Sequence, residues 1–73
     1  MHKEVVITTE FITLGQLLKM TDVIPSGGMA KAFLQENTVL VNGEVESRRG
    51  RKLKDGDIVE IPDIASFKIK GSA

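Results

Sequence analysis

The clearest structural signal in this chain is the stretch Val39-Leu40-Val41-Asn42-Gly43-Glu44-Val45-Glu46. An Asn-Gly pair between two valine-containing runs favours a two-residue turn, because asparagine and glycine accept the positive φ angles that such a turn requires. The stretch therefore predicts a β-hairpin with Asn42 and Gly43 at its tip.

A short helix is predicted on the N-terminal side of this hairpin. Thr13 and Gln16 have the spacing of a capping box, in which the threonine hydroxyl accepts from the amide of the glutamine and the glutamine side chain reaches back. Three leucines follow at the spacing of one helical face, at positions 14, 17 and 18. The pattern predicts a helix over residues 14–20 with this face against a core.

A second helix is predicted over residues 27–36. Pro25 separates it from the first helix, because proline lacks an amide proton and disfavours helical dihedrals at the residue before it. Ser26 is expected to cap this second helix, and Asn37 to end it in a left-handed conformation. The apolar face of the helix consists of Ala30, Phe33 and Leu34.

Three further strands are predicted near the ends of the chain. Residues 4–8 are mostly β-branched, which favours a short strand at a sheet edge. A turn at Asp55-Gly56 precedes a strand over residues 58–61. Phenylalanine and isoleucine alternate with lysine over residues 67–70, as in a half-buried strand. Residues 71–73 are expected to fray.

The size and composition of the chain agree with these elements. The 73 residues are 41% hydrophobic and 27% charged, which fits a single domain over residues 1–73. The order of the elements predicts the α+β class, with two short helices packed on a small, mostly antiparallel sheet. The apolar runs are far shorter than the roughly 18 residues that span a bilayer, and we expect neither a membrane protein nor a signal peptide. The lack of cysteine fits a cytoplasmic location.

Side chains that carry catalytic or metal chemistry are scarce. The chain has one histidine, no cysteine and carboxylates that are scattered singly. These make neither a metal ligand set nor a nucleophile with its base. We therefore expect no enzymatic activity, no cofactor and no metal site.

The charge is unevenly distributed, although ten basic and ten acidic residues cancel. Residues 1–47 hold three basic and six acidic side chains, whereas residues 48–73 hold seven basic and four acidic ones. The run Arg48-Arg49-Gly50-Arg51-Lys52-Leu53-Lys54 has five positive charges and no acid. Such a run is typical of a polyanion contact, since arginine binds phosphate through two parallel hydrogen bonds. The alternative is that Arg48 and Arg49 only pair with Glu44 and Glu46.

The start of the second predicted helix also allows two interpretations. Gly27 and Gly28 cost about 1 kcal/mol each relative to alanine in a helix, so a specific need for bare backbone is expected. Free amides at a helix start, with Lys31 one turn further on, would suit an anion. Equally, the two glycines would let the loop between the helices pack closely.

All three aromatic residues are phenylalanines. Phe33 and Phe67 lie on apolar faces and are assigned to the core, which leaves Phe11 as the one stacking candidate. Recognition of single strands through several stacked bases is therefore not favoured. Contact with the phosphates of folded RNA fits this sequence better.

The order of these segments resembles the S-four RNA-binding domain, also called the alpha-L motif, first described in ribosomal small-subunit protein four. The resemblance covers residues 12–61 and is carried by Leu14-Gly15-Gln16-Leu17-Leu18-Lys19, Ser26-Gly27-Gly28-Met29-Ala30-Lys31, Val39-Leu40-Val41-Asn42-Gly43 and Gly56-Asp57-Ile58-Val59. Most members have arginine after the serine, where this chain has Gly27. This variant and the basic run are similar to the short stand-alone bacterial members of the YaaA/YbcJ type, which are assigned to RNA binding and linked to ribosome assembly. The resemblance implies that Lys31 and the basic run face RNA.

Two other functions remain open. Residues 41–44 and 53–61 also resemble the β-grasp sulfur carriers, which act through a C-terminal Gly-Gly, whereas this chain ends Gly-Ser-Ala. The basic run would equally suit a protein-interaction adaptor for an acidic protein surface.

The prediction is a non-catalytic, monomeric RNA-binding protein. Its expected partner is structured RNA, either ribosomal RNA or a ribosome assembly intermediate, and neither a membrane nor a small-molecule substrate is expected. The residues predicted to contact RNA are Gly27, Gly28, Lys31, Arg48, Arg49, Arg51 and Lys52.

Overall fold

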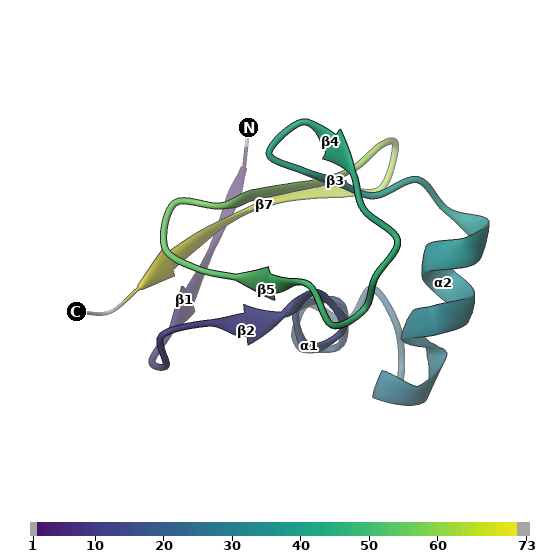
Figure 1. Cartoon of the computed structure of the whole chain (residues 1–73), viewed down its shortest axis with the longest axis horizontal. Coiled ribbons are helices and arrows are strands. Elements are labelled where there is room, and N and C mark those ends of the chain that lie inside the picture. The colour runs from purple at the N-terminus through teal and green to yellow at the C-terminus, as the bar shows by residue number, and fades with distance from the viewer. Residues whose placement is uncertain (1, 72–73) are drawn as a thin grey trace.

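Figure 1 shows the computed structural model, which describes residues 2–71. Within that range the chain forms seven strands, two α-helices and one short 3₁₀ helix. In chain order these are β1 (Lys3–Ile7), β2 (Ile12–Thr13), α1 (Leu14–Met20), the 3₁₀ helix (Gly27–Met29), α2 (Ala30–Glu36), β3 (Leu40–Val41), β4 (Glu44–Val45), β5 (Lys52–Leu53), β6 (Ile58–Ile61) and β7 (Ala65–Gly71). The α+β class predicted from the sequence is confirmed.

Five of the strands form one sheet in the order β1-β7-β6-β3-β4. β1 runs parallel to β7, and all other neighbours in this sheet are antiparallel. The N-terminal strand lies at an edge, as expected from its short β-branched sequence. The remaining two strands, β2 and β5, pair with each other as a separate antiparallel ribbon.

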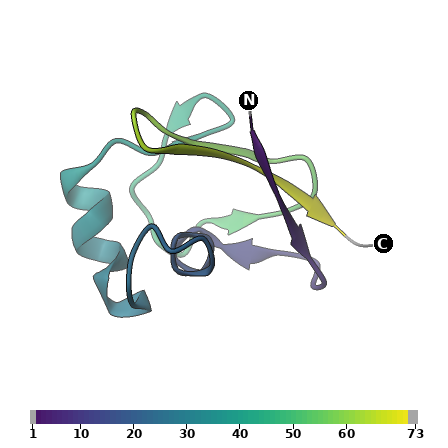
Figure 2. The ribbon, with the colours of Figure 1, turned by 180° about the vertical axis from the view of Figure 1, so that it is seen from behind.

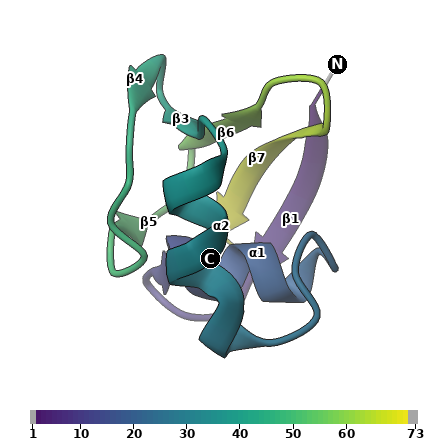
Figure 3. The ribbon, with the colours of Figure 1, turned by 90° about the vertical axis from the view of Figure 1, so that its right-hand side faces the viewer.

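The core lies between the five-stranded sheet and a second layer that consists of α1 and the β2–β5 ribbon. Figure 2 shows this layering from behind, and Figure 3 shows α2 beside α1 at one end of the sheet. Phe67 and Ile69 of β7 are buried, whereas Lys68 and Lys70 are exposed on the outer face of the sheet. The side chains that are completely buried come from both layers: Leu14, Leu17, Leu18, Val39, Leu53, Val59 and Ile69.

The local signals for the first helix and the hairpin are confirmed. Thr13 Oγ1 accepts from the amide of Gln16 at 3.2 Å, and Gln16 Oε1 accepts from the amide of Thr13 at 2.8 Å. These two bonds are the capping box that starts α1. At the hairpin tip, Asn42 and Gly43 have φ angles of 52° and 84°, as a two-residue turn requires.

The second helix ends at Glu36 as predicted, but its start and the conformation of the residue that follows it differ from the prediction. Residues 27–29 form a 3₁₀ turn and the α-helix starts only at Ala30, because two glycines in succession favour the α-helix poorly. Ser26 precedes the turn in an extended conformation, but its side chain makes no capping hydrogen bond. Asn37 is extended at φ −127° rather than left-handed. Its amide and its side-chain nitrogen both donate to the carbonyl of Phe33, which ends the helix without a left-handed residue.

The observed strands also differ from those predicted from the sequence. Neither β2 nor β5, which lies in the basic run of residues 48–54, was predicted, because these short strands form only by pairing with each other. The first strand ends at Ile7 rather than Thr8. Gly71, expected to fray, belongs to β7 and donates its amide to Asp55 Oδ1 at 2.9 Å. The rest of the predicted tail, residues 72–73, lies outside the described residues.

Neither α-helix within residues 2–71 has the length and apolar character needed to cross a bilayer.

Candidate functional site

A buried carboxylate organises the basic segment that follows the hairpin. Glu46 is only 7% exposed, and its side chain accepts five hydrogen bonds. Oε2 accepts from the amides of Ser47 and Arg48 and from Nε of Arg48, at 3.0–3.1 Å. Oε1 accepts from Nη2 of Arg48 at 3.0 Å and from Nη1 of Arg51 at 2.9 Å. Two arginines are thereby fixed around one acid.

The electrostatics of this cluster favour its charged form. The side-chain hydrogen bonds from Arg48 lower the pKa of Glu46 from 4.5 to about 2, against the opposing effect of burial. The same contact raises the pKa of Arg48 above its usual value. Both groups are therefore ionised at neutral pH.

The alternative in which the arginines only pair with nearby acids holds in part. Arg48 and Arg51 pair with Glu46, but within residues 2–71 no ion pair joins Arg49 or Lys52 to a carboxylate. The side chain of Arg48 is still 74% exposed. Because a guanidinium has five N–H donors and Arg48 uses two of them on Glu46, the others remain open to a ligand.

The same segment is attached by its main chain to the start of α1. The amide of Leu14 donates to the carbonyl of Arg51, and the amide of Gly15 donates to the carbonyl of Arg49, each at 2.9 Å. These are amides of the first helical turn, which have no acceptor within their own helix. We call residues 46–52 the basic loop; it is fixed to Glu46 through side chains and to α1 through the backbone.

Gly15 allows the basic loop and both helices to approach one another. A Cβ at this position would lie 3.4 Å from the carbonyl oxygen of Arg49 and 3.4 Å from Cβ of Ala30. Either distance is at the limit of ordinary packing, so any larger side chain would push the loop away from α1. The position of Arg49 relative to α1 and α2 therefore depends on this glycine.

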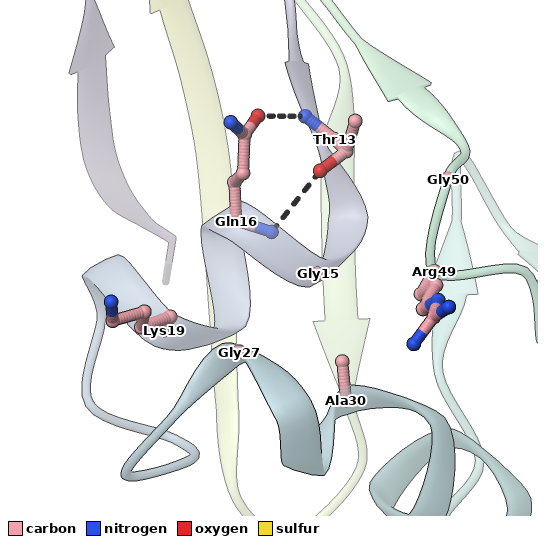
Figure 4. Close-up of a pocket in the computed structure, with 8 residues that line it drawn as sticks. All are labelled: Thr13, Gly15, Gln16, Lys19, Gly27, Ala30, Arg49 and Gly50. Carbon is pink, nitrogen blue, oxygen red and sulfur yellow. Dashed lines mark hydrogen bonds between the residues drawn. The ribbon is translucent and has the colours of Figure 1, made fainter.

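A hollow of about 360 Å³ lies where the basic loop meets α1 and the 3₁₀ turn. Figure 4 shows the small residues Gly15, Gly27 and Ala30 between the side chains of Lys19 and Arg49. We call this the first hollow, and its lining residues are Thr13, Gly15, Gln16, Lys19, Gly27, Ala30, Arg49 and Gly50. Lys19 and Arg49 are the two basic residues that line it.

A second hollow, of about 550 Å³, includes the C-terminal end of the basic loop in its lining. It is lined by Glu10, Phe11, Asn42, Arg51, Lys52, Lys54 and Asp57. The two hollows divide the consecutive residues of the loop between them, since Arg49 and Gly50 line the first whereas Arg51 and Lys52 line the second.

The structure brings together only some of the residues predicted to contact RNA. Gly27 and Arg49 meet in the first hollow, and Arg51 and Lys52 line the second. The other three predicted residues are exposed and line neither hollow: Gly28, Lys31 and Arg48.

The interpretation of Gly27 and Gly28 as close-packing residues is wrong. A Cβ at Gly27 would meet no atom within 4 Å, and one at Gly28 would meet only the hydroxyl of Ser26, at 4.0 Å. The packing of the protein itself therefore does not require either glycine. Gly15 has that role instead.

Sequence reasoning missed two residues of this region, Gly15 and Lys19, and considered Glu46 only as a partner of Arg48 and Arg49. Gly15 lies in the first turn of the predicted helix, where glycine is less stable than alanine. This cost indicates that another segment packs closely against the helix at that position. Lys19 lies on the polar side of the helix and reaches the first hollow only because the loop folds back on α1. The register of the two-residue hairpin places Glu46 opposite the buried Val39, and this register is the signal from which its burial could have been predicted.

Comparison with known proteins identifies relatives over most of the chain. Residues 5–70 match the family described as S4 domain. A curated relative from Bacillus subtilis (strain 168), described as "Probable ribosome maturation protein RlbA", is 59% identical over 69 residues. The matched region covers 94% of this chain and 97% of that relative.

Proposed function

The chain belongs to the S4 domain family, and we propose that it is a non-catalytic RNA-binding protein that docks its basic loop on the phosphates of structured RNA. The relative described as a probable ribosome maturation protein supports a ribosomal target. The proposed partner is therefore ribosomal RNA, or an assembly intermediate that contains it.

The observation that carries this proposal is the basic loop, which is held in a defined position and keeps a net positive charge. Residues 46–52 contain four basic side chains and one acid, so the loop keeps a net charge of +3. Glu46 holds Arg48 and Arg51 in defined positions, whereas Arg49 and Lys52 have no carboxylate partner within residues 2–71. Positioned arginines lose less conformational entropy on binding phosphate than mobile ones would.

The first hollow adds a place for a phosphate beside the loop. Lys19 and Arg49 supply charge from two sides, and the exposed backbone at Gly27 leaves room for close approach. Gly28 and Lys31 would extend the contact along the 3₁₀ turn and α2. In this proposal the arginines make forked contacts, and the lysines act as point charges.

The proposal is tested by binding of purified protein to ribosomal subunits and to a structured ribosomal RNA fragment. The informative variant combines Arg49→Ala with Lys52→Ala, because removing these side chains leaves Glu46 fully paired. The matched control combines Lys3→Ala with Lys68→Ala, which removes the same charge from the five-stranded sheet.

We expect the loop variant to lose affinity for both probes several-fold more than the control variant. Equal losses of affinity in the two variants would mean that binding depends only on the net charge of the protein. That result would overturn the assignment of the basic loop as the RNA contact. If the wild type binds neither probe, the protein-adaptor function becomes the better account, and the next experiment is a search for an acidic protein partner.

A further inference from the structure

The β2–β5 ribbon turns an aromatic side chain and a lysine toward the same side. Ile12 pairs with Leu53 and Thr13 pairs with Lys52 in its register. Ile12 and Leu53 are buried, and side chains alternate between the faces of a strand. Lys52 therefore lies on the outer face of the ribbon. Phe11, which directly precedes β2, lies on the same face.

Phe11 differs from the other two aromatic residues. Phe67 is buried and Phe33 packs partly against the core, whereas Phe11 is 41% exposed. Its backbone is held by Thr9, whose hydroxyl donates to the carbonyl of Phe11 at 2.7 Å. Nζ of Lys52 lies 4.8 Å from the centre of the Phe11 ring, which is within the range of a cation–π contact. The result is an exposed ring in a defined position, with a cation over one of its faces.

The second hollow surrounds this pair with fixed polar groups. Asn42 Nδ2 donates to Asp57 Oδ1 at 3.1 Å, and Asn42 Oδ1 accepts from the amide of Ile58 at 2.9 Å. Asp57 Oδ2 accepts from the amide of Lys54 at 2.9 Å. The hollow is therefore lined by preformed polar groups as well as by the ring, and its volume lies in the range of small-ligand sites.

We propose that Phe11 is the stacking platform for one unpaired base of the bound RNA, and that Lys52 contacts the phosphate of that nucleotide. This inference rests on the proposed function, since it assumes that the basic loop follows an RNA backbone. A nucleotide combines a flat apolar face with an anion, and the second hollow offers an exposed ring beside a lysine. Because consecutive residues of the basic loop line the two hollows, an RNA strand that follows this loop would contact both.

The test compares two hairpin RNAs that have the same stem and the same loop length. One carries a loop of uridines, and the other carries abasic residues in the loop, so that both have the same phosphate charge. Stacking on a protein aromatic is worth about fivefold to a hundredfold in affinity for each base. We expect wild-type protein to prefer the uridine loop by such a factor, and Phe11→Leu to abolish that preference.

Two further variants separate this inference from the proposed function. Arg49→Ala should weaken binding to both hairpins by the same factor, because it removes a phosphate contact that does not depend on bases. Phe11→Trp should keep the preference. It also introduces the only tryptophan of the chain, so its fluorescence should be quenched by the uridine loop and not by the abasic one.

The outcomes are distinguishable. If wild-type protein binds both hairpins equally, or if Phe11→Leu weakens both by the same factor while it melts like the wild type, the stacking site is overturned and the phosphate contact stands. If wild-type protein binds neither hairpin, the stacking site is overturned, whereas the proposed function is overturned only if the protein also fails to bind ribosomal subunits and the ribosomal RNA fragment.

Discussion

Replacing Glu46 with glutamine removes the acid that holds the basic loop in place. The substitution preserves the shape of the side chain but turns one of its two oxygens into an NH₂ group. Oε1 accepts two hydrogen bonds and Oε2 accepts three. Whichever oxygen is replaced, a new donor faces at least two existing donors. The variant therefore loses at least two hydrogen bonds as well as the charge.

The size of the effect follows from the pKa of Glu46. The Arg48 contacts lower it from 4.5 to about 2, and a shift of that size corresponds to about 3 kcal/mol of folding free energy at most. Because the partner Arg48 is 74% exposed, solvent screening reduces this value, and we expect a loss of about 1 to 2 kcal/mol. For a domain of this size, that lowers the melting temperature by roughly 5 to 15 °C.

The effect should depend on pH in a defined direction. A carboxyl whose pKa is lowered by folding stabilises the protein above its unfolded pKa, and that contribution is lost as the pH falls toward the folded pKa. The gap between wild type and Glu46→Gln should therefore be complete above about pH 4.5 and shrink toward pH 2. Thermal unfolding followed by circular dichroism across this range measures it. Equal stability at pH 7, or a gap that stays constant down to pH 2, would refute this account of the loop.

Three other substitutions test separate parts of the structure. Gly27→Ala should leave the melting temperature unchanged or slightly raised, since a Cβ there meets no atom within 4 Å; a lower affinity for ribosomal RNA in the same variant would place RNA against the backbone, and unchanged affinity would exclude Gly27 from the contact. Gly15→Val should cost about 1 to 3 kcal/mol in urea unfolding, because its side chain meets the carbonyl of Arg49; wild-type stability would mean that the loop moves freely. Thr13→Ala should cost about 0.5 to 2 kcal/mol, because the capping box is lost; no change in urea unfolding would show that the loop carbonyls alone are enough to start α1.

Local signals predicted the elements that are determined by adjacent residues. The capping box at Thr13 and Gln16 and the turn at Asn42 and Gly43 depend on residues at most three apart, and both formed as expected. The ribbon of β2 and β5 was missed because each strand has two residues and its partner is about 40 residues away. A strand of that length has no periodicity to detect.

The site was only partly predictable for a related reason. The two-residue turn pairs Leu40 with Val45 and places Glu46 opposite the buried Val39, so Glu46 faces the core and Val45, which is 73% exposed, faces outward. The buried carboxylate is stabilised by Arg48 and Arg51, which come later in the chain and satisfy the acid only once the loop has folded. The basic run itself was visible as a charge pattern, but its position against Lys19 depends on the tertiary fold.

The most direct test of RNA recognition by the basic loop is the salt dependence of affinity for a structured ribosomal RNA fragment. If about five phosphates are neutralised, log affinity should fall against log salt with a slope of roughly −3.5 to −4.5 for wild type. Arg49→Ala should make the slope shallower by roughly 0.7 to 0.9, whereas Lys68→Ala on the outer face of the sheet should leave it unchanged. An affinity that does not change with salt, or equal slopes for the two variants, would contradict the account.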